Sequence, residues 1–162
     1  MYETDKIDMK IIELLMEDGR MPAAEIARRI GDVSSRTVRY RIEQLIENNL
    51  IKISAIVNPR KFGYSTIADV FIEVETGLIQ EVAQKLAFYD RVSYIAYAIG
   101  ETDVSIQVVA RDTSEVYSFV TDVIGKIPGV RKTTTSIVPL IIKDVYQWRV
   151  PESDSDINAA EE

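Results

Sequence analysis

Side chains that can donate hydrogen bonds to phosphate oxygens or base edges gather between Ser34 and Asn49. They are Arg36, Thr37, Arg39, Tyr40, Arg41 and Gln44. Apolar side chains recur in the same segment at the i, i+4, i+7, i+8 spacing of one helical face: Val38, Ile42, Leu45 and Ile46. Ser34 or Ser35 can cap this helix, and its N-terminus then offers free N–H groups to an anion. Such a helix suits the DNA major groove, although a solvated surface helix has the same pattern.

Two further amphipathic helices are predicted before this segment, at residues 5–18 and 22–30, and each ends at a glycine. A tight turn from Gly31 joins the second helix to the third. In this helix-turn-helix arrangement the last helix is the reader. Residues 50–59 are predicted to form a short strand. The predicted DNA-binding residues are Arg28, Arg29, Ser34, Ser35, Arg36, Thr37, Arg39, Tyr40, Arg41 and Lys52, with Arg28, Arg29, Arg41 and Lys52 on phosphates.

The charge distribution favours nucleic acid although the net charge of the whole chain is −7. Residues 20–61 hold nine basic and four acidic side chains, a local net charge of +5. The segments before and after carry −4 and −8. Phosphates respond to charge within a Debye length of about 8–10 Å, so the basic segment can bind DNA while the acidic remainder is repelled.

The composition excludes several classes of site. The chain has no cysteine, which excludes disulfides, thiolate metal sites and a cysteine nucleophile, and no histidine, the commonest general base and metal ligand. We therefore expect no enzyme activity, metal or other cofactor. No apolar run approaches the roughly 18 residues of a membrane span, and the first ten residues do not resemble a signal peptide, so we expect a cytoplasmic protein with no membrane partner.

The remaining sequence predicts a second domain, so the chain is expected to be an α+β protein. The predicted boundaries are a helix-turn-helix domain over residues 1–58, a linker over 59–65 and a sheet domain over 66–149. Strands are predicted at 66–75, 92–99, 104–110 and 130–149, with helices at 78–89 and 112–126. This βαββαβ order is ferredoxin-like, and its two helices leave one sheet face open, for which a second copy is the simplest cover. Residues 150–162 are predicted to be a disordered acidic tail.

Several local motifs together carry a family resemblance. They are Asp5-x-x-Asp8-x-x-Ile11 in the first helix, Glu25-Ile26-Ala27 in the second, Thr37-Val38-x-x-Arg41-Ile42 in the third, Gly100-x-x-Asp103, and Ile127-Pro128-Gly129-Val130. With the domain order, they make the chain resemble the Lrp/AsnC (feast/famine) family of prokaryotic transcriptional regulators over roughly residues 5–149. Pro139 is a departure, because it interrupts the last predicted strand where a backbone donor is needed.

The resemblance implies a sequence-specific DNA-binding regulator whose assembly or DNA affinity responds to a small metabolite, usually an amino acid. It implies homodimers that can assemble into octamers and an effector site near the Gly-x-x-Asp hairpin. The effector-binding residues would be Gly100, Thr102, Asp103, Thr133 and Thr135. Their chemistry fits, because Gly100 permits close backbone approach, Asp103 can accept from an ammonium group and the threonines supply hydroxyls. A plain hairpin turn and ordinary strand threonines would have the same residues.

Two alternatives belong to other classes of function. Some proteins that resemble this family are enzymes that decarboxylate sirohaem, but their chemistry is thought to use histidine, which this chain lacks. The second alternative is an effector-binding hub whose helix-turn-helix no longer reads DNA, and the basic segment 20–61 argues against it.

Overall fold

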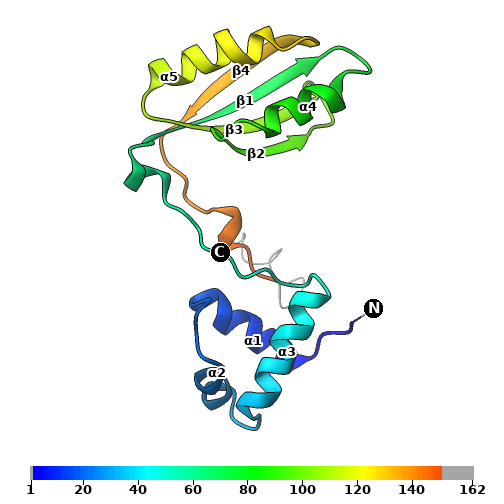
Figure 1. The fold of residues 1–162 in the computed structure, drawn as a ribbon, viewed down its shortest axis with the longest axis vertical. Coiled ribbons are helices and arrows are strands. Elements are labelled where there is room, and N and C mark those ends of the chain that lie inside the picture. The colour runs from blue at the N-terminus through cyan, green and yellow to red at the C-terminus, as the bar shows by residue number, and fades with distance from the viewer. Residues whose placement is uncertain (1, 151–162) are drawn as a thin grey trace, which may run out of the picture. The chain divides into compact units, whose positions relative to one another are not determined.

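A computed structural model describes residues 2–150 of the chain (Figure 1). They divide into two compact units, which are considered separately. One holds the residues up to Ile56 together with those from Lys143, and the other spans Val57–Ile142. Residues 151–162, which make up nearly all of the predicted acidic tail, lie outside the described residues. No helix of the described part of the chain is both long and apolar enough to cross a membrane.

Three short helices form the first unit: α1 at Lys6–Glu17, α2 at Ala23–Ile30 and α3 at Ser35–Glu47. Each boundary follows from a local signal. The Asp5 side chain accepts hydrogen bonds from the first turn of α1, and Ser34 caps α3 through the N–H of Thr37. Gly31 ends α2 with a φ of 101°, a conformation that favours glycine.

The three helices bury one small core, because none of them is long enough to be stable alone. Its fully buried apolar side chains are Ile11, Ile26, Val38 and Leu45, joined by Ala27. Val38 and Leu45 confirm most of the apolar face predicted for α3, and Ile42 packs against this core, but Ile46 is 42% exposed and lies outside it. The core therefore fixes which side of α3 turns away from solvent.

The second unit is a four-stranded antiparallel sheet with strand order β2-β3-β1-β4 (Figure 1). Its strands are β1 at Thr66–Val74, β2 at Val92–Tyr97, β3 at Val104–Ala110 and β4 at Val130–Val138. The helices are α4 at Ile79–Ala87, between β1 and β2, and α5 at Thr113–Ser118, after β3. The predicted βαββαβ order is confirmed.

Alternation along β1 separates a covered sheet face from an open one. Val70 and Ile72 are fully buried beneath residues of α4 and α5, whereas Phe71 between them is 37% exposed on the opposite face. The open face also carries Tyr94 of β2, which is 53% exposed, and a hydrogen bond of 3.0 Å from Gln107 to Asp69. Both helices thus cover the same face, and the other is bare in one protomer.

The structure corrects three of the predicted elements. Residues 51–58 form no strand, because they have no ladder partner among the described residues and the N–H groups of Leu50 and Ile51 bond back to Leu45. Strand β4 ends at Val138 and not at residue 149, because Pro139 has no N–H to donate. The helix predicted over 112–126 is α-helical only to Ser118 and continues as a π turn and a 3₁₀ turn to Lys126.

The compact units divide the chain at other residues than the predicted domains do. The described residues from Lys143 group with the helical unit, although the predicted sheet domain runs to residue 149. The predicted linker contains a 3₁₀ turn at Pro59–Phe62. A strand pattern shows which face of a segment can be buried, but it does not supply the neighbouring strand that the backbone needs.

Gly129 makes the closest glycine approach in the sheet unit, and its replacement by alanine should be destabilising. Gly129 has a φ of 94°, and an added Cβ would lie 2.8 Å from Leu78 Cδ1. We expect Gly129→Ala to lower the free energy of unfolding by about 2–4 kcal/mol, from overpacking added to backbone strain. The matched control is Gly77→Ala, where φ is 92° but no atom lies within 4 Å of the added Cβ. Equal losses in urea unfolding would show that the Leu78 contact is unimportant.

Candidate nucleic-acid interface

The outer side of α3 carries the side chains predicted to read DNA. Arg36, Thr37, Arg39 and Tyr40 are all exposed, and Tyr40 retains 62% of its accessible surface. Arg39 makes one weak contact, 3.4 Å from its Nε to the carbonyl oxygen of Ser35. Val38 lies among them in sequence but points into the core with no exposed surface. The arginines of this side are therefore free to meet an anion without unfolding the helix.

Serine and threonine shape the N-terminus of α3. Ser34 Oγ accepts from the N–H of Thr37 at 3.1 Å and lies 2.9 Å from the Thr37 hydroxyl. The Thr37 hydroxyl is thus held at the helix start, and Ser35, the first helical residue, is half-buried. The N-terminal turn presents its polar groups where an anion is favoured by the helix dipole.

Arg28 and Arg29 of α2 are exposed, but both are engaged by carboxylates. Arg28 Nη2 lies 2.6 Å from Glu25 Oε1, and Arg29 Nη1 lies 2.8 Å from Glu17 Oε2. A second contact of 3.2 Å joins Arg29 Nε to Glu25. Hydrogen bonds from Arg28, and next from Arg29, lower the pKa of the Glu25 carboxyl to about 2. A phosphate at either arginine would have to compete with these carboxylates.

The lowered pKa of Glu25 predicts a pH dependence of stability. Because the folded-state pKa is about 2 against an ordinary value of 4.5, this stabilisation is present above pH 4.5 and is lost as the pH falls toward 2. We expect the Tm of wild type to fall more steeply below pH 4.5 than that of Glu25→Gln. Glu13→Gln, which removes an exposed carboxylate from α1, is the control and should follow wild type. A constant difference between wild type and Glu25→Gln would contradict the prediction.

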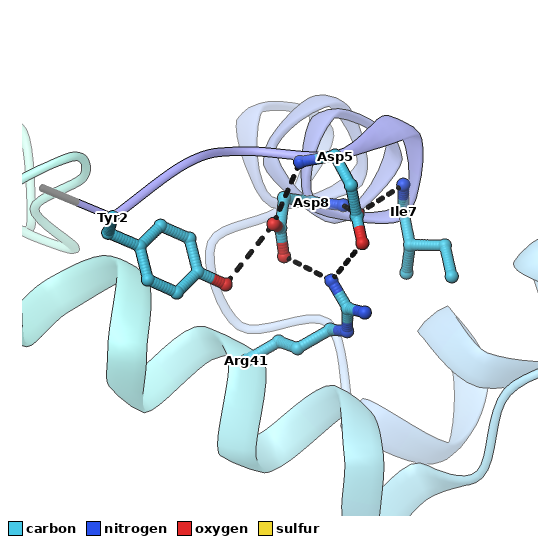
Figure 2. Close-up of polar contacts among 5 residues, drawn as sticks. All are labelled: Tyr2, Asp5, Ile7, Asp8 and Arg41. Atoms are coloured by element: carbon cyan, nitrogen blue, oxygen red, sulfur yellow. Dashed lines mark hydrogen bonds and ion pairs between the residues drawn. The ribbon is translucent and has the colours of Figure 1, made fainter.

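Arg41 was predicted to contact phosphate, but its side chain turns toward α1 (Figure 2). Its Nη1 lies 2.8 Å from Asp5 Oδ2 and 2.8 Å from Asp8 Oδ1, and the side chain is only 22% exposed. The hydrogen bond from Arg41 to Asp8 is the main cause that raises the pKa of this guanidinium. Arg41 is thus placed apart from the exposed arginines of α3. Lys52, the remaining residue predicted to contact phosphate, follows α3 in the sequence and is exposed.

Asp8 and Tyr2 were missed by the sequence reasoning. Asp8 is 1% exposed, and among the residues that the structure describes it is the one charged residue that is buried. Its Oδ2 accepts from the Tyr2 hydroxyl and from the N–H of Asp5, each at 3.1 Å. Burial, followed by this hydrogen bond to Asp8, raises the pKa of the Tyr2 hydroxyl. The available signal was the Asp5-x-x-Asp8 spacing, since Asp5 and Asp8 cap each other's backbone at the start of α1.

The predicted effector residues lie on two sides of β1. Gly100 has a φ of 146°, and Asp103 Oδ2 accepts from the N–H of Val74 at 2.8 Å, which ties the β2–β3 hairpin to the end of β1. Thr133 and Thr135 lie on β4 opposite Ile72 and Val70, toward the helix-covered side. Because β1 runs between β3 and β4, the hairpin and the threonines are separated by two strand spacings, roughly 10 Å. Thr102 is half-buried beside Asp103.

Comparisons with known proteins agree with both units. Residues 5–46 match the AsnC-type helix-turn-helix domain, and residues 68–147 match the Lrp/AsnC ligand binding domain. HTH-type transcriptional regulator FL11 of Pyrococcus abyssi is 39% identical over 135 residues, which cover 83% of this chain and 88% of that protein. The chain belongs to the Lrp/AsnC family. It is a helix-turn-helix transcriptional regulator of that type, and its relatives are regulators rather than enzymes.

Three other regulators are similar to this chain over most of its length. LrpA of Pyrococcus horikoshii is 33% identical over 135 residues, covering 83% of this chain and 95% of that one. The structure of AsnC from Escherichia coli superimposes with a TM-score of 0.82 at 27% identity, covering 90% of this chain and 99% of AsnC. A transcriptional regulator of Neisseria meningitidis, solved as an L-Met complex, gives 0.81 at 25% identity, covering 88% and 94%. The matches to these proteins include both units of the fold.

Proposed function

We propose that this Lrp/AsnC regulator binds double-stranded DNA with the outer face of α3 and that a small metabolite, an amino acid, modulates its DNA affinity or assembly. The observation that carries the proposal is the division of α3 into a buried side with Val38 and Leu45 and an exposed side with Arg36 and Arg39. Arginine on an exposed helix face can bond guanine edges and phosphates in the major groove. Arg28, Arg29 and Lys52 then lie on phosphates.

The proposed DNA-binding species is a homodimer built through the open face of the sheet. Phe71 and Tyr94 expose aromatic surface on that face, next to the polar Asp69–Gln107 pair. A two-fold dimer presents the same patch twice, so the apolar surface of one copy covers that of the other. It also provides two copies of α3, and we therefore expect a two-fold symmetric DNA site. Dimers could assemble further into octamers.

The proposed effector site involves Gly100, Thr102 and Asp103 of the hairpin together with Thr133 and Thr135. Support for an amino acid comes from the L-Met complex of the Neisseria meningitidis regulator. Asp103 already accepts from Val74 through one carboxylate oxygen, so an ammonium group would use the other. Since β1 separates the hairpin from the threonines within one protomer, we propose that a ligand meets these two groups from different copies of the chain.

Salt titration of DNA binding tests the first part of the proposal. The probe is a duplex selected by the protein from a random-sequence library, with binding read by fluorescence anisotropy. We expect the logarithm of the binding constant to fall linearly with the logarithm of salt concentration, by about 0.9 for each phosphate neutralised. Sedimentation should give the mass of a dimer or a larger even assembly. If no duplex is selected or bound at low salt, the protein is an effector-binding hub.

A thermal-shift screen against the twenty amino acids tests the effector. A ligand that binds only the folded form raises Tm in proportion to its occupancy. Thr135→Val should abolish the shift, because it removes one hydroxyl proposed to contact the ligand. Thr134→Val is the matched control, since Thr134 pairs with Phe71 and faces the opposite side of β4. A shift that survives Thr135→Val unchanged would exclude this hydroxyl, and the absence of any shift would exclude amino-acid effectors.

A further inference from the structure

We infer that Arg41 and Asp8 form a positioning pair that sets the rotation of α3 and thereby the direction of its reading side chains. The inference rests on the proposed DNA-binding function. It assigns Arg41 a role other than phosphate contact, and it assigns a functional role to Asp8, which cannot itself reach DNA because it is 1% exposed. The pair joins the start of α1 to the middle of α3 (Figure 2).

The contacts around Arg41 hold it more firmly than a surface ion pair is held. Its Nη1 donates at 2.8 Å to both Asp5 and Asp8, which lie 36 and 33 residues away in sequence. Asp5 is itself fixed, because its Oδ1 accepts from the N–H groups of Ile7 and Asp8 at 2.8 and 2.9 Å. Tyr2 holds the other oxygen of Asp8. Each acceptor of the guanidinium is thus oriented by a second hydrogen bond.

Burial explains why Arg41 stays in this position when DNA is present. If Arg41 swung outward to a phosphate, the Asp8 carboxylate would remain buried with no cationic partner. Leaving a buried charge unpaired is strongly unfavourable, whereas an exposed arginine such as Arg39 reaches a phosphate by exchanging water. The geometry therefore divides the arginines of α3 into exposed ones that can bind DNA and one that is retained by the fold.

The position of Arg41 on α3 links the Arg41–Asp8 pair to the direction of the side chains that are proposed to contact bases. At about 100° per residue, Arg41 lies roughly 160° around α3 from Arg39, on nearly the opposite side. The apolar contacts of Val38 and Leu45 bring α3 against its neighbours, but hydrophobic burial is non-directional. The charge-assisted hydrogen bonds of Arg41 are short and directional, so they restrict rotation of the helix about its axis. A rotation of α3 would move Arg36 and Arg39 away from the bases.

Distance measurement by electron paramagnetic resonance tests the orientation directly, without DNA. The chain has no cysteine, so spin labels can be placed only where cysteines are introduced. Lys10→Cys on α1 and Glu43→Cys on α3 provide two exposed positions, and labelled protein is diluted with unlabelled protein. We expect Asp8→Asn and Arg41→Gln to broaden or shift the distance distribution between the labels, whereas Arg39→Gln leaves it unchanged. Identical distributions in all variants would overturn the inference.

DNA binding tests the consequence with the same variants and Lys52→Gln, at a temperature where circular dichroism shows them folded. The probes are the duplex that wild type selects from a random library and a duplex of unrelated sequence. We expect Lys52→Gln, which removes an exposed cation proposed to lie on a phosphate, to reduce the salt slope by about one per protomer. Arg41→Gln and Asp8→Asn should keep the slope and lower the ratio of selected to unrelated affinity about tenfold, comparable with one mismatched base pair. A loss of stability alone would not change this ratio for folded protein.

The outcomes separate the inference from the proposed function. A salt slope reduced as much by Arg41→Gln as by Lys52→Gln, or a ratio unchanged by Asp8→Asn, would overturn the positioning role. If wild type binds neither duplex, the proposed function fails, but the label distances still decide whether the pair sets the orientation of α3. If Asp8→Asn does not fold, Tyr2→Phe replaces it, because it removes only one hydrogen bond to Asp8. It should change the distance between the labels and the ratio of selected to unrelated affinity in the same direction, but by less.

Discussion

Replacing Arg36 and Arg39 together with alanine is expected to lower affinity for the selected duplex about 10³-fold, with little change in stability. Both side chains are exposed, and surface substitutions usually change the free energy of unfolding by no more than about 0.5 kcal/mol. A two-fold dimer presents each arginine twice. If each lost contact costs at least about 1 kcal/mol, the four together account for roughly 4 kcal/mol. Anisotropy titrations and urea unfolding measure the two quantities.

A control double variant at two lysines distinguishes DNA contacts made by α3 from a general electrostatic attraction between the helical unit and DNA. Lys6 and Lys10 are exposed on α1, in the same unit but outside the helix-turn-helix pair α2–α3. Lys6→Ala/Lys10→Ala removes the same charge and should weaken binding far less. An equal loss in both double variants would mean that the net charge of the helical unit, and not the outer face of α3, determines affinity. An inability of Arg36→Ala/Arg39→Ala to fold would mean that these side chains support the core.

Ile72→Ala and Phe71→Ala should affect different properties, the stability of the protomer and the stability of the dimer, although the two residues are neighbours on β1. Ile72 is fully buried on the covered face, where it pairs with Val104 of β3 and Thr133 of β4. Its truncation should lower the free energy of unfolding by about 2–5 kcal/mol, a large part of the 5–15 kcal/mol typical of a domain. Denaturant unfolding followed by circular dichroism measures the loss. A change below about 1 kcal/mol would show that the cavity collapses without cost.

Phe71→Ala tests the open face and is the control for Ile72→Ala. Phe71 is 37% exposed, so its truncation should leave the stability of the protomer nearly unchanged. If the open face is the dimer interface, an aromatic side chain of the central strand β1 is expected to contribute 2 kcal/mol or more, and the dimer dissociation constant should rise about 30-fold. Sedimentation over a range of concentrations measures it. A dissociation constant equal to that of wild type would place the interface elsewhere.

Much of the fold could be predicted because the signals are local. Apolar residues at helical spacing predicted α1–α3, and the strand and helix patterns after residue 65 predicted the βαββαβ order of the second unit. The errors occurred where a local pattern depends on a distant partner. Residues 51–58 have the composition of a strand but no neighbouring strand, and the segment after Pro139 could not extend β4. The π turn after Ser118 has no sequence signal that the periodicity could detect.

The sequence by itself determined that this protein is an α+β chain with a basic helix-turn-helix and a βαββαβ unit, and it placed Arg36, Thr37 and Tyr40 opposite the apolar stripe of α3, with Arg39 on the flank. Periodicity and capping act over one or two helical turns, so they can be read without knowing the tertiary contacts. Only the tertiary structure decided that Arg41 pairs with a buried Asp8 and that Asp103 supports β1. These contacts join residues about 30 positions apart, and the choice of partner depends on how the whole unit packs.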